Sequence, residues 1–198
     1  MNETRPPRLR PILLLSLGLA LAACTGSEEP PLKGAAIGGP FTLTNQDGRK
    51  VTERDFAGKY RIMYFGFTHC PDVYPTDLAV IGQALRRFEE SDPARAARVA
   101  PIFVSVDPER DSPAVLKDYV AAFHPRLVGL TGTPEQVAET VKRYGAYGAK
   151  EAPGSGGGYN VNHSRVAELI GPDGEPIALL PYEKGAEAVA AELERWVR

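Results

Sequence analysis

The sequence predicts an α/β fold in which a central mixed sheet is flanked by helices. Two runs rich in aromatic and β-branched residues, RIMYFGF at 61–67 and APIFVSV at 100–106, are typical of buried strands. Each run is followed by a segment whose apolar residues recur at helical spacing. Strands that alternate with helices, and a late hairpin before a last helix, favour an α/β sandwich built on a mixed sheet.

The remaining elements are predicted from alternation, capping residues and turn residues. FTLTNQDGRKV, at 41–51, alternates apolar and polar residues around an Asp-Gly turn and predicts an N-terminal β-hairpin. Ser-Pro and Thr-Pro-Glu-Gln are typical helix starts. The expected helices are 75–90, 112–123, 133–144 and 185–198, with a short strand at 127–130, a glycine-rich loop at 145–159 and a hairpin at 165–180.

The totals describe one ordinary globular domain, which we place at 40–198. The chain has 198 residues, a formal net charge of −2 and 43% hydrophobic residues. This is enough to bury a core in one domain. The sequence pI of about 6.0 implies no basic face. Nucleic acid is therefore excluded as the main partner.

The first residues are predicted to be a targeting segment. Three arginines precede a short apolar stretch, as in a secretory signal. The run LAAC, which ends at Cys24, resembles the bacterial lipoprotein cleavage box. This resemblance implies a signal peptide at 1–23, lipid on Cys24 and a flexible tether at 24–39 to the outer side of a bacterial membrane. The alternative is an ordinary signal peptide or an uncleaved anchor.

Cys70 follows the first buried strand and precedes a helix. Thioredoxin-like folds keep their reactive sulfur at this place, because free N–H groups and the helix dipole favour a thiolate. The sequence therefore predicts a thioredoxin-like fold with a functional thiol. The alternative is a buried structural cysteine. If Cys24 carries lipid, Cys70 is the one free thiol and no internal disulfide can form.

Several segments, in this order, resemble the Sco/SenC family of thioredoxin-fold copper chaperones, which assist assembly of the binuclear copper centre of cytochrome c oxidase. The resemblance covers about 38–196 and rests on the runs GGPFTLTNQDGRKVTERDFAGKY, YFGFTHCPDVYPTDL, VSVDPERDSP, LTGTPEQV and VNHSRVAELIGPDG. It implies a copper ion as cargo. It also implies the copper-accepting subunit of the oxidase as partner, in a metallochaperone rather than an enzyme.

The family's site is a Cys-x-x-x-Cys-Pro loop and a distant histidine before a serine. By this resemblance Cys70 is the first cysteine and His163 is the histidine. Tyr74 stands where the family has its second cysteine. Asp107 matches an acidic position near the copper site, so the resemblance implies that it tunes the two ligands. Its other interpretation is a turn residue.

The missing sulfur alters the expected chemistry. Cu(I) is a soft ion that prefers thiolate, thioether and imidazole ligands. The tyrosine phenol has a reference pKa of about 10 and is neutral near pH 7. We expect weaker Cu(I) binding than in a two-cysteine relative, or a Cu(II) site in which Tyr74 joins Cys70 and His163. Any thiol-disulfide chemistry would need a second thiol from a partner protein.

Simpler interpretations stay open for two of these residues. His163 is otherwise a loop histidine bonded to backbone, and Tyr74 otherwise packs its ring over the loop. Two other functions also stay open. One is a one-thiol redox protein or peroxidase, for which Thr68 is available but no arginine adjoins the motif in the sequence. The other is a docking module that binds no metal.

Overall fold

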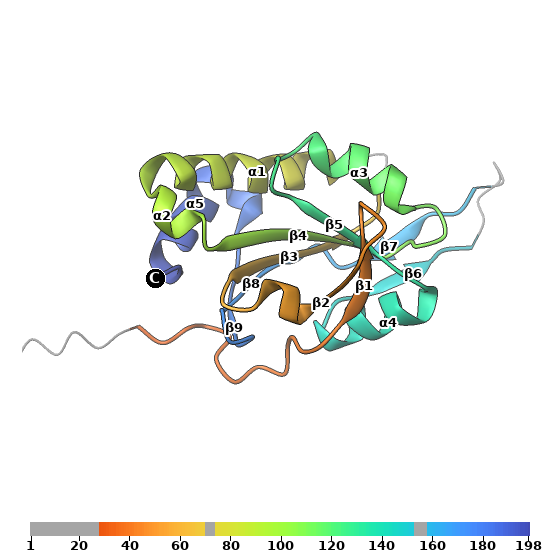
Figure 1. Ribbon diagram of the computed structural model, residues 1–198, viewed down its shortest axis with the longest axis horizontal. Coiled ribbons are helices and arrows are strands. Elements are labelled where there is room, and N and C mark those ends of the chain that lie inside the picture. Colours follow the sequence, from red (N-terminus) through yellow and green to blue (C-terminus); the bar gives the residue numbers. More distant parts are fainter. Residues whose placement is uncertain (1–27, 70–73, 153–157) are drawn as a thin grey trace, which may run out of the picture.

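The computed structural model describes residues 28–69, 74–152 and 158–198. A seven-stranded sheet forms its centre (Figure 1). In sheet order the strands are β2 (Lys50–Thr52), β1 (Thr42–Asn45), β5 (Val128–Thr131), β4 (Val99–Ser105), β3 (Tyr60–Gly66), β8 (Ala167–Ile170) and β9 (Pro176–Leu179). Strands β3, β4 and β5 run parallel, and the hairpins β1–β2 and β8–β9 flank them in antiparallel pairing. The mixed sheet and the N-terminal hairpin are both confirmed.

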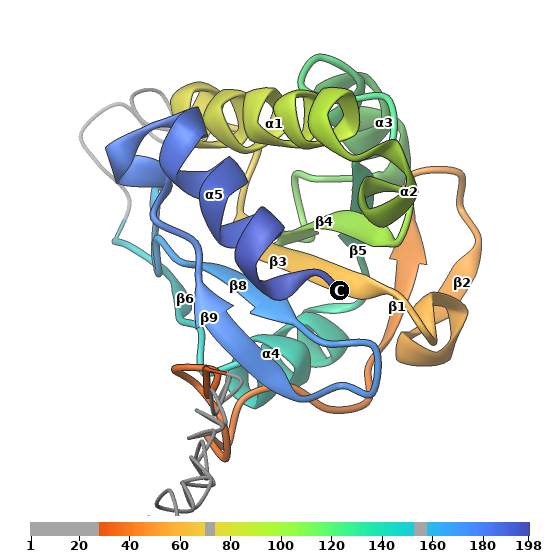
Figure 2. The ribbon, with the colours of Figure 1, turned by 90° about the vertical axis from the view of Figure 1, so that its left-hand side faces the viewer.

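Helices cover both faces of the sheet (Figure 2). One face carries α1 (Tyr74–Ser91), α2 (Pro93–Ala96), α3 (Pro113–Ala121) and α5 (Ala186–Trp196), and the other carries α4 (Pro134–Arg143). Two short 3-10 turns are η1 (Glu53–Phe56) and η2 (Tyr182–Lys184).

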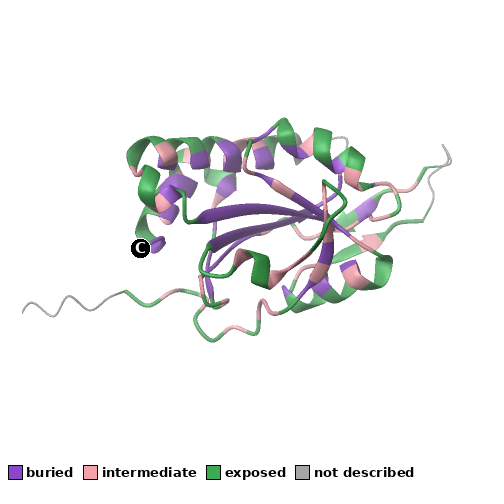
Figure 3. Ribbon diagram, in the orientation of Figure 1, coloured by how far each residue is buried: buried purple, intermediate pink, exposed green. Residues whose placement is uncertain are grey.

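The core lies on both sides of β3, all of whose residues are buried (Figure 3). Ile62 and Tyr64 pack with α1, α3 and α5, while Met63 and Phe65 pack with α4. The side chains alternate because successive residues of a strand point to opposite faces. A strand buried on both faces explains the nearly continuous apolar run that predicted it.

The predicted helix starts are confirmed by their caps. The Ser112 hydroxyl accepts a hydrogen bond from the Val115 N–H at the start of α3. At the start of α4, Thr133 and Gln136 form a capping box in which each side chain accepts from the other residue's N–H. These bonds satisfy donors that the first helical turn leaves unpaired.

A small second sheet has one strand inside the loop expected at 145–159 and the other just after it. Strand β6 (Gly148–Lys150) pairs with β7 (Val161–His163), so that Gly148 is opposite His163. These three-residue strands show too little alternation to be predicted from sequence. A Cβ on Gly148 would lie 2.9 Å from the Cβ of Val106. Glycine therefore allows β6 to approach the loop that follows β4.

Residues 28–39, the later part of the expected tether, pack against the domain. The Leu32 N–H donates to the Ile177 carbonyl at 3.0 Å, and the Gly38 N–H donates to the Arg143 carbonyl at 3.0 Å. Glu28 also pairs with Arg195 of α5. Residues 28–39 thus contact the edge strand β9 and the helices α4 and α5. The predicted signal peptide and Cys24 lie outside the described residues, and no helix within the described ranges is long and apolar enough to cross a membrane.

Candidate functional site

The predicted site maps to the end of the molecule where β3 and β4 finish and where β6 and β7 lie, opposite the C-terminus (Figure 1). The structure describes the side chains of His163 and Asp107. Cys70 lies outside the described residues, and Tyr74 is placed as the first residue of α1. The described residues before Cys70 end at His69.

The His163 ring lies beside the segment that leads to Cys70. Phe67, which directly follows β3, is 1% exposed, and its ring meets the His163 ring edge-on at a centroid distance of 5.6 Å. Phe67 is three residues before Cys70 in the sequence. The fold thus brings an imidazole from a distant segment next to Phe67, which precedes Cys70 in the sequence.

Burial favours the neutral form of His163. Burial lowers the pKa of His163 below its ordinary value, although hydrogen bonding to the carbonyls of Ser164 and Phe65 acts in the opposite direction. Its Nδ1 lies 2.7 Å from the Ser164 carbonyl oxygen. The neutral imidazole is the form that binds a metal.

The loop that leaves β3 is tied down by Asp111, which the sequence interpretation overlooked. This carboxylate is fully buried and accepts from the Thr68 N–H at 3.0 Å, the Thr68 hydroxyl at 2.7 Å and the Ser105 hydroxyl at 2.6 Å. It therefore holds the backbone two residues before Cys70. The only sequence signal was a second aspartate in VDPERD.

Asp107 is occupied by two partners from the same end of the molecule. Its carboxylate is 1% exposed, accepts from the Tyr159 hydroxyl at 2.8 Å and forms a short ion pair with Arg110. Its N–H donates to the Ser105 hydroxyl at 3.0 Å. Asp107 is thus more than a turn residue, because it binds the Tyr159 segment to the loop after β4.

Arg110 lies near Phe67 in space, although no arginine adjoins the motif in the sequence. Its guanidinium carbon is 5.5 Å from the centre of the Phe67 ring and 3.9 Å from the centre of the Tyr159 ring. The loops after two adjacent parallel strands meet at the same edge of a sheet. Arg110 is therefore near Phe67 in space although 43 residues separate them in the sequence.

The start of α1 is tied to the His163 segment by polar contacts to the buried Asp77. Asp77, in the first turn of α1, is 5% exposed and accepts from the Tyr64 hydroxyl at 2.9 Å. Arg165, two residues after His163, donates to both oxygens of Asp77 at 3.1 and 2.9 Å. A bidentate arginine–carboxylate pair fixes the two groups strongly in place.

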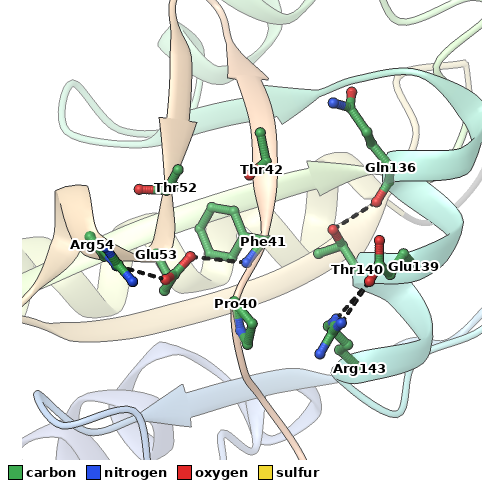
Figure 4. Close-up of a pocket in the computed structure, with 10 residues that line it drawn as sticks. All are labelled: Pro40, Phe41, Thr42, Thr52, Glu53, Arg54, Gln136, Glu139, Thr140 and Arg143. Atoms are coloured by element: carbon green, nitrogen blue, oxygen red, sulfur yellow. Dashed lines mark hydrogen bonds and ion pairs between the residues drawn. The ribbon is translucent and has the colours of Figure 1, made fainter.

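A pocket elsewhere offers no comparable chemistry. It has a volume of about 470 Å³ and lies between the N-terminal hairpin and α4 (Figure 4). Its charged side chains pair with one another: Glu53 with Arg54, and Glu139 with Arg143. Within the described ranges, no group of three or more His, Cys, Asp or Glu side chains is arranged to hold a metal ion, and the set predicted here includes Cys70, which lies outside them.

Comparison with known proteins identifies the family. The SCO1/SenC family model matches residues 29–198. The chain is 43% identical over 146 residues to the mitochondrial protein SCO1 homolog 1 of Arabidopsis thaliana, a match that covers 74% of this chain and 42% of that relative. The human SCO1 homolog is 37% identical, and the match covers 53% of its length. The chain thus spans about half the length of these curated relatives.

Solved structures agree with the predicted fold. The structure of Bradyrhizobium japonicum ScoI with copper bound is 41% identical with a TM-score of 0.73, and the match covers 81% of this chain and 99% of that one. The thioredoxin domain of a Bacteroides vulgatus thiol-disulfide oxidoreductase, 17% identical, shares the fold alone, with a TM-score of 0.56 and coverage of 84% and 98%. The thioredoxin-like fold predicted from the sequence is confirmed, and the chain belongs to the SCO1/SenC family.

Proposed function

We propose that this protein binds copper through Cys70 and His163 and delivers it to the copper-accepting subunit of cytochrome c oxidase. The observation that carries the proposal is the His163 imidazole, whose ring meets the Phe67 ring edge-on next to the residues that lead to Cys70. Thiolate and imidazole are ligands that suit Cu(I). The likeness to a copper-bound ScoI over nearly the whole of that chain supports the same cargo here.

The site is a one-thiol variant of the family's site. With Tyr74 in place of the second cysteine, the site lacks one soft, negatively charged ligand. A neutral phenol does not replace a thiolate. Cu(I) is therefore held less tightly than in a two-cysteine relative, and Asp107 acts from outside the ligand set by holding the Tyr159 segment.

The first test is a Cu(I) competition titration of the full chain, purified in detergent. We expect one Cu(I) per chain, and both Cys70→Ser and His163→Ala should abolish this binding because each removes a ligand. His124→Ala is the matched control. His124 is also buried, but its ring lies near Glu89 rather than at the candidate site.

Unaltered Cu(I) binding in either ligand variant would contradict the proposed ligand set. The Cys70→Ser variant also tests the one-thiol peroxidase alternative. This alternative is favoured by Thr68, two residues before Cys70, and by Arg110, which lies near the Phe67 ring. Peroxide consumption with added thiol reductant should be no faster for the wild-type protein than for this variant. A faster rate in the wild-type protein would support the peroxidase instead.

We also propose that lipid on Cys24 holds the protein on the outer face of a bacterial membrane. Support comes from the LAAC run and the apolar stretch before it. In fractionated bacterial cells, wild-type protein should sediment with membranes. Cys24→Ala removes the sulfur that would carry lipid, and the mature lipidated species should be lost from the mass spectrum. An unchanged mass of the mature protein would contradict lipidation.

A further inference from the structure

Arg110 links three segments that are distant in the sequence. Its guanidinium carbon lies 3.9 Å from the centre of the Tyr159 ring and 5.5 Å from the centre of the Phe67 ring. Its Nε donates to the Asp107 carboxylate, and its Nη1 donates to the Tyr159 carbonyl at 3.0 Å. One side chain therefore joins the loop after β4 to the residue after β3 and to the segment that leads into β7.

These contacts need an arginine rather than any cation. The planar guanidinium can stack on an aromatic ring and at the same time donate several hydrogen bonds from a rigid fork. Its charge balances the Asp107 carboxylate, which is 1% exposed and would otherwise be a buried unpaired charge. Lysine keeps the charge but has neither the plane nor the fork.

The same contacts help to place His163, whose segment Arg165 also holds from the other side through Asp77. Tyr159 is four residues before His163 on one segment, and the Phe67 ring that Arg110 covers meets the His163 ring at 5.6 Å with an interplanar angle of 86°. Arg110 thus holds the His163 segment at Tyr159 and packs against the ring that the imidazole touches. The β6–β7 pairing alone joins that segment only to another three-residue strand.

We propose that Arg110 is a positioning residue that holds the segment carrying His163 against Phe67, so that the imidazole faces the residues leaving β3 in one arrangement. The expected effect on Cu(I) affinity rests on the proposed function. The placement of the segment does not, because it is measurable without metal.

The test compares Arg110→Lys with Arg126→Lys in the full chain in detergent. Arg126 is a matched control because it also forms an ion pair, with Glu89, and donates from Nη1 to two carbonyls, those of Ala96 and Val99, at 3.1 and 2.9 Å. Arg126 contacts Val99, the first residue of β4, whereas Arg110 is in the loop after Ser105, the last residue of β4. The control therefore lies at the opposite end of this strand from the candidate site.

Arg110→Lys should speed amide hydrogen exchange at Val161–His163 in the metal-free protein and lower Cu(I) affinity by ~10-fold or more, as changes around a metal's ligands usually do. Arg126→Lys should alter neither readout, even where it lowers the melting temperature equally. Equal exchange and equal copper affinity in the two variants would overturn the proposal. If the wild-type protein binds no copper, the proposed function fails, and the exchange comparison still decides this inference.

Tyr159→Phe separates the guanidinium contacts from the hydroxyl contact. This variant keeps the ring and the carbonyl that Arg110 uses and loses only the hydrogen bond to Asp107. Exchange and copper affinity close to those of the wild-type protein are expected. A loss as large as that of Arg110→Lys would assign the positioning to Asp107 and overturn the role given to Arg110.

Discussion

Replacing Tyr74 by cysteine should raise the affinity for Cu(I) by ~100-fold or more, since even changes outside a metal's ligand set cost ~10–100-fold. Tyr74 is the first residue of α1. The free N–H groups and dipole at a helix start stabilise a thiolate there. The substitution would supply the soft anionic ligand that Cu(I) prefers. Competition titration of the full chain against a Cu(I) chelator measures the change.

Two controls make this result interpretable. Val115→Cys adds a thiol at an exposed position of α3 and should leave Cu(I) affinity unchanged. Tyr74→Cys combined with His163→Ala should lose most of the gain if the imidazole is a ligand. If Tyr74→Cys alone binds Cu(I) no more tightly than the wild-type protein, the site has diverged beyond the missing sulfur.

Glu168→Gln should stabilise the protein at pH 8 and have little effect near pH 5. Glu168 of β8 is 2% exposed, and its Oε2 has no hydrogen-bond partner in the part of the chain that the structure describes. Burial raises the pKa of Glu168 from 4.5 to about 8. The buried Arg61 does not offset this shift, because within the described residues it forms no ion pair with Glu168 and its Nη2 donates to the Gly171 carbonyl at 3.5 Å.

The sign of the effect follows from proton linkage. Because the pKa is higher in the folded state than in the unfolded state, the folded state binds more protons between these values. The stability that the neutral carboxyl allows is complete below about pH 4.5 and is lost as pH rises through about 8. At 1.36 kcal/mol per pKa unit, the full loss is on the order of 5 kcal/mol.

Urea unfolding at pH 5, 6.5 and 8 measures this loss, with the fluorescence of the single tryptophan, the buried Trp196, as the signal. The difference in unfolding free energy between Glu168→Gln and the wild-type protein should grow as the pH rises. Glu139→Gln, at an exposed position of α4 paired with Arg143, should show no such trend. A pH-independent difference for Glu168→Gln would show that its pKa is not raised.

Much of the fold was predictable because its signals are local. The apolar run at β3, the alternation at 41–51 and the capping residues Ser112 and Thr133 all act within a few residues of themselves. The β6–β7 pairing was missed because its stability comes from contacts outside the strands, such as Gly148 against Val106. The seating of 28–39 was missed for the same reason, since Leu32 bonds to Ile177, far along the chain.

The candidate site divides along the same line. Residue type and the motif order shared with the family suffice to nominate Cys70 and His163. They also identify Tyr74 as the residue that stands in place of the second cysteine. This is possible because ligand chemistry belongs to the side chain itself. The supporting roles of Asp111 and Arg110 follow from parallel strands that bring the loops after β3 and β4 together. Hydrogen bonds and ring contacts act over a few ångströms of space, and the spacing of residues along the chain does not record that distance.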